Sequence, residues 1–131
     1  MFADAEASGS GKRRIDRGAA ESILETARTS GLVARPFRDE PRQAIEGICF
    51  CCDDCCWYFR RPEERCDKGA LIERTRMEGC THCGLCVAPC HFHARSMGAG
   101  ALVVERALCY GCGLCVVACP EGCVEMVQRG A

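Results

Sequence analysis

The chain has 131 residues, which is enough for one small domain with an appendage and excludes a large multidomain enzyme. Leu, Ile, Val and Phe together number only 25, whereas there are 15 cysteines and the formal net charge is −1. So few large aliphatic residues beside so many cysteines are typical of proteins held together by disulfides or by metal.

The N-terminal region lacks the basic start and the roughly 7 to 15 apolar residues of a secretory signal peptide. No stretch approaches the roughly 20 apolar residues of a membrane span. We therefore expect a cytoplasmic protein without a membrane span, in which thiols stay reduced and serve as metal ligands. Because acidic and basic side chains are balanced along the chain, we expect no nucleic acid as a partner.

The sequence pattern divides the chain into four regions. They are a disordered tail, a helix with a linker, a Cys-rich segment, and a domain built on a repeat, over residues 1–14, 15–47, 48–69 and 70–131.

The second region begins with a pattern of apolar residues at three- and four-residue steps. Asp16 is suited to cap the N-terminus of this helix, and Gly31 is suited to end it. Pro36, Pro41 and the charges between them then predict a linker.

Residues 80–97 and 109–126 are two copies of one sequence, offset by 29 residues. Eight of the eighteen aligned positions are identical, including all four cysteines of each CxxCxxCxxxC run. A unit this short cannot bury a core alone, so we expect two copies related by a pseudo-twofold axis. The β-branched runs 101–105 and 124–128 predict strands, and the expected fold class is a small α+β domain.

Three thiolates at this spacing can wrap one iron–sulfur cubane while a fourth ligand comes from elsewhere. Gly84 and Gly113 allow the backbone to approach closely. On these motifs, and with Pro120 after the last cysteine of the second run, residues 80–127 resemble a bacterial two-[4Fe-4S] ferredoxin. The resemblance implies a ferredoxin-like (βαβ)2 domain that carries two [4Fe-4S] clusters.

The resemblance also implies that the fourth cysteine of each run binds the other cluster. The ligands of cluster I are then Cys80, Cys83, Cys86 and Cys119, and those of cluster II are Cys109, Cys112, Cys115 and Cys90. Zinc is the rival, but it needs two CxxC pairs per ion and leaves the third and fourth cysteine of each run without a role.

His91 stands where the first run lacks the proline of the second, which makes the surroundings of Cys90 depart from the family pattern. His91, and less so His82 and His93, are alternative iron ligands. A histidine beside a cluster more often donates a hydrogen bond. We expect Cys123 to be a small buried residue packed against a cluster.

Six further cysteines lie upstream: Cys49, Cys51, Cys52, Cys55, Cys56 and Cys66. The favoured interpretation is a third metal centre, either an iron–sulfur cluster or zinc, that uses the CxxC pair of Cys52 and Cys55. Its two other ligands are drawn from Cys49, Cys51, Cys56 and Cys66. Thiol–disulfide chemistry and contact with a partner's cofactor are the alternatives. This segment followed by the repeats also resembles, more weakly, an uncharacterised group of iron–sulfur proteins from anaerobes with a CxCC/CC segment.

The sequence has no nucleotide-binding glycine loop and no catalytic triad, so the main functional expectation is one-electron transfer. The chain is then an electron carrier or an electron-transfer subunit of anaerobic metabolism rather than an enzyme by itself, and its partner is a larger redox enzyme or reductase. The alternatives are a catalytic or sensing subunit that uses the Cys49–Cys66 segment, and a regulatory module that its clusters only fold.

Overall fold

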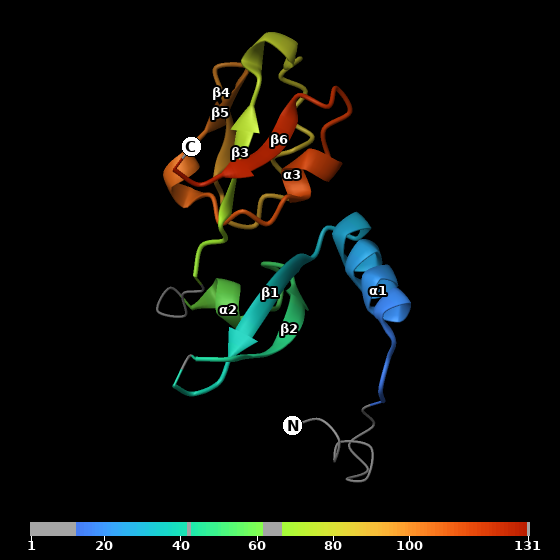
Figure 1. Cartoon of the computed structure of the whole chain (residues 1–131). Coiled ribbons are helices and arrows are strands. Elements are labelled where there is room, and N and C mark those ends of the chain that lie inside the picture. The colour runs from blue at the N-terminus through green and yellow to red at the C-terminus, as the bar shows by residue number, and fades with distance from the viewer. Residues whose placement is uncertain (1–12, 42, 62–66, 131) are drawn as a thin grey trace.

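The computed structural model describes residues 13–41, 43–61 and 67–130, and the structural statements below concern these residues. Figure 1 shows two parts that follow one another along the chain. The N-terminal part contains α1, β1, β2 and α2, and the C-terminal part contains β3 to β6 with the short helix α3. No helix in the described ranges is long and apolar enough to cross a membrane.

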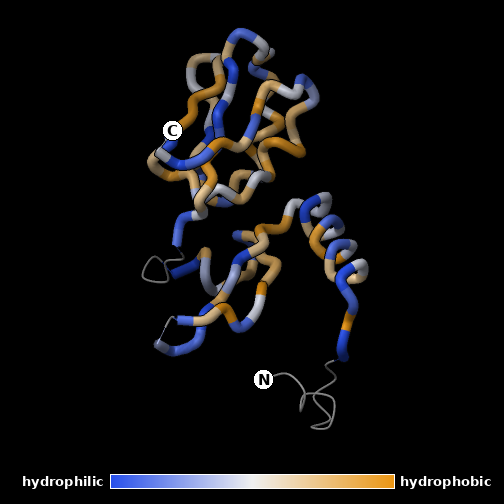
Figure 2. Tube along the Cα trace, in the orientation of Figure 1, coloured by the Kyte–Doolittle hydropathy of each residue, from blue (hydrophilic) through white to orange (hydrophobic). Residues whose placement is uncertain are grey.

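The first helix, α1, spans Arg17–Thr29 and confirms the prediction for this region. The side chain of Asp16 accepts a hydrogen bond from the N–H of Ala19 at 2.8 Å, which satisfies one of the free donors at the helix N-terminus. Gly31 ends the helix in the left-handed region, with φ at 72°. Hydrophilic and hydrophobic residues alternate along α1 (Figure 2).

The prediction of a linker after this helix is wrong, because most of this segment forms a β-hairpin. Strand β1 (Val33–Arg38) pairs antiparallel with β2 (Ile45–Cys51). Pro36 is tolerated because both strands of a two-stranded sheet are edges, where a missing N–H costs little. The carboxylate of Asp39 accepts backbone N–H groups from Gln43 and Ala44 and so closes the turn. The one-turn helix α2 (Trp57–Arg60) follows.

The C-terminal part is a small mixed α/β unit with two antiparallel two-stranded sheets. One sheet pairs β3 (Leu71–Thr75) with β6 (Val124–Gln128), and the other pairs β4 (Arg95–Gly98) with β5 (Ala101–Val104). The strand predicted at 124–128 is confirmed, and the one predicted at 101–105 is confirmed except for its last residue.

The 29-residue offset of the sequence recurs in the structure. The single-turn 3-10 helices η1 (Met77–Gly79) and η2 (Arg106–Leu108) are separated by this offset. Each sheet pairs the first strand of one copy with the last strand of the other, so exchanging the two copies leaves the pairing unchanged. This is the arrangement expected for a pseudo-twofold axis. The copies differ at 85–89, which form turns where the second copy has α3 (Leu114–Val117).

The core of this part is small and rich in sulfur. One buried cluster consists of Cys86, Leu102, Cys115, Cys123 and Val124, and a second of Ile72, Ala94 and Cys109. Four of these eight buried residues are cysteines, so the environment of the thiols decides how well the unit packs.

Candidate metal centres

The eight cysteines of the two CxxCxxCxxxC runs, together with Cys123, line two cavities, which we name chamber I and chamber II. The cysteines of chamber I are Cys80, Cys83, Cys86, Cys119 and Cys123. Those of chamber II are Cys90, Cys109, Cys112 and Cys115. The fourth cysteine of each run thus lies with the first three of the other run, which is the crossed grouping that the ferredoxin resemblance implies.

In the described ranges, no group of three or more His, Cys, Asp or Glu side chains is arranged to hold a metal ion. The four thiols of each crossed set surround a space instead of converging on one point.

Glycines let the backbone curl around each chamber. Gly84 lines chamber I and Gly113 lines chamber II, and their φ angles are 76° and 78°. A side chain is disfavoured at these left-handed positions. A Cβ at Gly84 would also come within 3.3 Å of the sulfur of Met97.

Burial keeps thiols of chamber II protonated. It raises the pKa of Cys112, and it raises the pKa of Cys115 to about 11 even though the Arg95 guanidinium acts in the opposite direction. Because thiolates are the form that binds metal, metal binding at these thiols must displace their protons.

Backbone N–H groups favour the thiolate at Cys119 of chamber I. Burial acts to raise the pKa of Cys119, but N–H groups of the segment 121–124 and the thiol of Cys123 lower it overall. The two sulfurs lie 3.4 Å apart, and Cys123 is 3 % exposed. Cys123 is therefore a small buried residue beside chamber I, as expected.

None of the three histidines belongs to the residues that line the chambers. The ring of His82 accepts the N–H of Leu102 through Nδ1 at 3.0 Å, and its own backbone N–H points to the sulfur of Cys80 at 3.4 Å. The ring of His91 instead reaches the N-terminal part. His82 and His93 have φ near 55°, where the second copy has glycines with positive φ.

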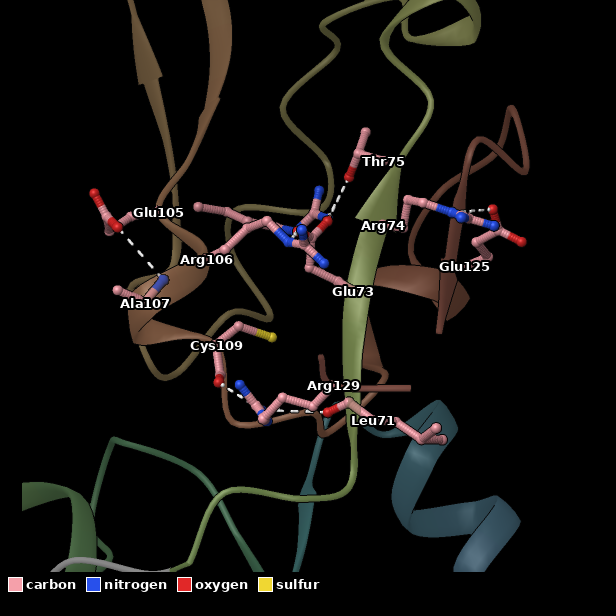
Figure 3. A network of polar contacts seen from close by, with 11 residues as sticks. Leu71, Glu73, Arg74, Thr75, Glu105, Arg106, Ala107, Cys109, Glu125 and Arg129 are labelled. Carbon is pink, nitrogen blue, oxygen red and sulfur yellow. Dashed lines mark hydrogen bonds and ion pairs between the residues drawn. The ribbon is translucent and has the colours of Figure 1, made fainter. Parts of the chain in front are cut away.

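A buried ion pair between the chambers was missed by sequence reasoning. The Nη2 atom of Arg95 lies 2.6 Å from Oε2 of Glu73, and both side chains are at most 3 % exposed. Figure 3 shows Glu73 and Arg74 on opposite sides of β3, with Arg74 directed to Glu125 at the surface. An alignment of the two copies beyond the cysteine runs could have indicated it, because Glu73 then aligns with the apolar Leu102.

The described upstream cysteines lie on β2 and in the turn that joins β2 to α2. The structure brings the thiols of Cys51 and Cys56 together in a hydrogen bond, with the Arg35 guanidinium nearby. Cys51 is buried, whereas Cys55 is exposed. Cys49 and Cys52 are half-buried, and Cys66 lies outside the described residues.

No family model matches this chain, and no curated protein matches it either.

Proposed function

We propose that the protein is an iron–sulfur electron-transfer protein that holds two [4Fe-4S] clusters, one in each chamber. The observation that carries the proposal is the grouping of eight cysteines into two crossed sets of four, each lining one cavity. When bound, such a cluster takes up and gives back one electron with little change in shape. The ferredoxin resemblance of residues 80–127 supports the same assignment.

The donor set fits a cubane better than a single zinc ion. Four thiolates on one zinc lie about 3.8 Å from one another, because each Zn–S bond is about 2.3 Å long and the site is tetrahedral. A cubane binds each thiolate at a different iron, so the four sulfurs stand around a larger object. Thiols that line a chamber suit the second arrangement.

The chain's own residues prepare the chambers for negative charge. The N–H of His82 points at the sulfur of Cys80, and Arg95 donates an N–H to the sulfur of Cys86 at 3.2 Å. Hydrogen bonds to cluster sulfurs stabilise negative charge and so influence the reduction potential.

The partner that this function requires is a larger redox enzyme with a basic docking surface. Two clusters with their thiolates would change the formal charge from −1 to about −5, because each oxidised cluster with four thiolates carries about −2. A charge of this sign steers the protein towards a basic surface on a reductase.

Anaerobic reconstitution with iron and sulfide tests the proposal. We expect about eight iron and eight sulfide ions per chain, with two EPR-active sites that each accept one electron reversibly. Uptake of zinc alone, or iron that shows no reversible one-electron signal, would overturn it.

The contact between Cys51 and Cys56 favours a second candidate function, thiol–disulfide exchange. The Cys56 thiolate would attack a substrate disulfide and release one substrate thiolate. Cys51 would then attack the mixed disulfide, release the second thiolate and close a Cys51–Cys56 disulfide, so that two electrons pass to the substrate. Reduction of a small disulfide by the thiol-reduced protein, lost in Cys56→Ser, tests this candidate.

A further inference from the structure

The two chambers are similar, but a polar group of three buried or half-buried side chains has no counterpart in the second copy. Arg95 donates through Nη2 to Glu73 at 2.6 Å and to the hydroxyl of Thr75 at 2.7 Å, and that hydroxyl donates to Glu73 at 2.6 Å. Burying two charges costs several kcal/mol per ion unless they are well paired and hydrogen-bonded, as they are here.

The second copy has apolar residues at all three equivalent positions. With the 29-residue offset, Leu102, Val104 and Val124 correspond to Glu73, Thr75 and Arg95. The strand registers agree with this alignment, because Glu73 lies opposite Met126 and Leu102 lies opposite Met97. Leu102 and Val124 are buried, and Val104 packs against them. The same backbone positions are therefore stably filled without charge, and the fold itself does not require the ion pair.

The two charged side chains of this group contact different chambers. Glu73 lines chamber II, whereas the equivalent wall of chamber I is formed by Leu102. Arg95 donates an N–H to the sulfur of Cys86, a cysteine of chamber I.

We propose that the Glu73–Arg95 pair makes the two sites unequal, so that the first electron from a low-potential one-electron donor is held in chamber I. This inference rests on the proposed function. The N–H of Arg95 stabilises added negative charge at Cys86, which raises the reduction potential of the cluster in chamber I. The carboxylate of Glu73 disfavours added negative charge in chamber II, which lowers the reduction potential of the cluster there. Glu73 and Arg95 are positioning residues here and not ligands.

The experiment is an anaerobic redox titration of the reconstituted full chain with dithionite, followed by EPR. The wild type should show two separate one-electron steps. The variant Glu73→Leu/Thr75→Val/Arg95→Val copies the residues of the second copy into the first, and its two steps should converge. In a Cys83→Ser background, the altered signal should belong to the step at higher potential, because Cys83 lines only chamber I.

A milder variant and a matched control keep the test independent of folding. Glu73→Gln keeps the Arg95 contact with Cys86 and should move the lower step towards the higher one. The control is Arg74→Leu/Glu125→Leu, which removes one positive and one negative charge from the same sheet at the surface, where the side chains are 60 % and 46 % exposed. It should leave the separation of the two steps unchanged.

Each result separates the inference from the function on which it depends. Two clusters whose steps stay equally far apart in both Glu73 variants, or a higher step assigned to chamber II, would overturn the inference and leave electron transfer intact. A wild-type protein that binds no redox-active clusters would overturn the proposed function itself.

Discussion

Nδ1 of the His91 ring lies 2.8 Å from Oδ1 of the Asp53 carboxylate. The other ring nitrogen of His91 lies 2.8 Å from the carbonyl oxygen of Gly31, at the end of α1. Because His91 follows Cys90 directly, these two contacts tie the N-terminal part of the molecule to a cysteine of chamber II.

The His91 contacts should stabilise the association of the two parts of the chain. We expect His91→Ala, which loses both ring contacts, to destabilise the β1–β2 hairpin by about 1 kcal/mol, because Asp53 is partly exposed and its contribution is screened. Native-state hydrogen exchange of the hairpin amides measures the effect.

Two substitutions at Asp53 separate the hydrogen bond from side-chain volume. Asp53→Asn retains an acceptor for the ring and should exchange almost like the wild type, whereas Asp53→Ala should show part of the effect of His91→Ala. If the hairpin amides of all these variants were as well protected from exchange as those of the wild type, the contact would not hold the hairpin in place.

The crossed arrangement of cysteines makes a prediction for Cys119. Replacing Cys119 by Ser removes a thiol of chamber I, while chamber II keeps Cys109, Cys112 and Cys115. EPR of the reduced variant should therefore show a changed signal for the cluster of the first run, although the mutation lies in the second. Cys90→Ser is the reciprocal control, and a change confined to the cluster of the mutated run would contradict the crossed assignment.

The sequence predicted the regular features that repeat or that have a local cause. The cap at Asp16 and the glycine at 31 determine the ends of α1 through contacts within a few residues. The strand β6 follows from its β-branched run and from its place after a repeated motif. Periodicity and spacing are sufficient for such elements.

The features that sequence reasoning missed depend on partners far along the chain. Pro36 suggested a linker, but the antiparallel partner β2 makes it an edge-strand residue. The pair Glu73–Arg95 spans 22 positions, and nothing near Glu73 indicates that a buried arginine will neutralise it. The hydrogen bond between Cys51 and Cys56 likewise depends on the turn between β2 and α2 and not on a CxxC spacing.

If the two chambers hold clusters as proposed, removing the metal should unfold the C-terminal part. Half of the residues in its buried clusters are cysteines, and thiols such as Cys112 and Cys115 have raised pKa values in the absence of metal. Binding energy at such sites is largely folding energy. Circular dichroism of chelator-treated, thiol-reduced protein should show no cooperative thermal transition from this part, and a retained transition would refute the expectation.

A third metal centre on Cys52 and Cys55 stays a proposal with its own test. If it exists, Cys52→Ser/Cys55→Ser should lower bound iron by about four per chain or remove one zinc, and leave the iron of the two chambers in place. Anaerobic metal analysis measures this. Cys51→Ser/Cys56→Ser tests in the same way whether these two thiols supply the remaining ligands, and unchanged iron and zinc in both double variants would contradict a metal centre in this segment.

Thiol reactivity with pH provides the sharpest test of the Cys51–Cys56 contact. Burial raises the pKa of Cys51 to about 12, and its hydrogen bond to Cys56 acts in the same direction. Burial also acts to raise the pKa of Cys56, but the hydrogen bond from Cys51 and the N–H groups of Tyr58 and Phe59 lower it overall. The Arg35 guanidinium, which stacks on the Tyr58 ring at 3.7 Å, favours both thiolates.

Because only the thiolate reacts with iodoacetamide, Cys56 should be alkylated before Cys51, and its rate should reach half its maximum at a lower pH than that of an ordinary exposed thiol. Cys51 should stay unlabelled throughout that range. In Cys51→Ala the thiol donor is lost, so the midpoint for Cys56 should move to higher pH. Arg35→Gln should move it in the same direction while keeping the donor. Mass spectrometry of the labelled peptides follows each thiol separately, and alkylation of Cys51 and Cys56 at equal rates would show that the two do not share a proton.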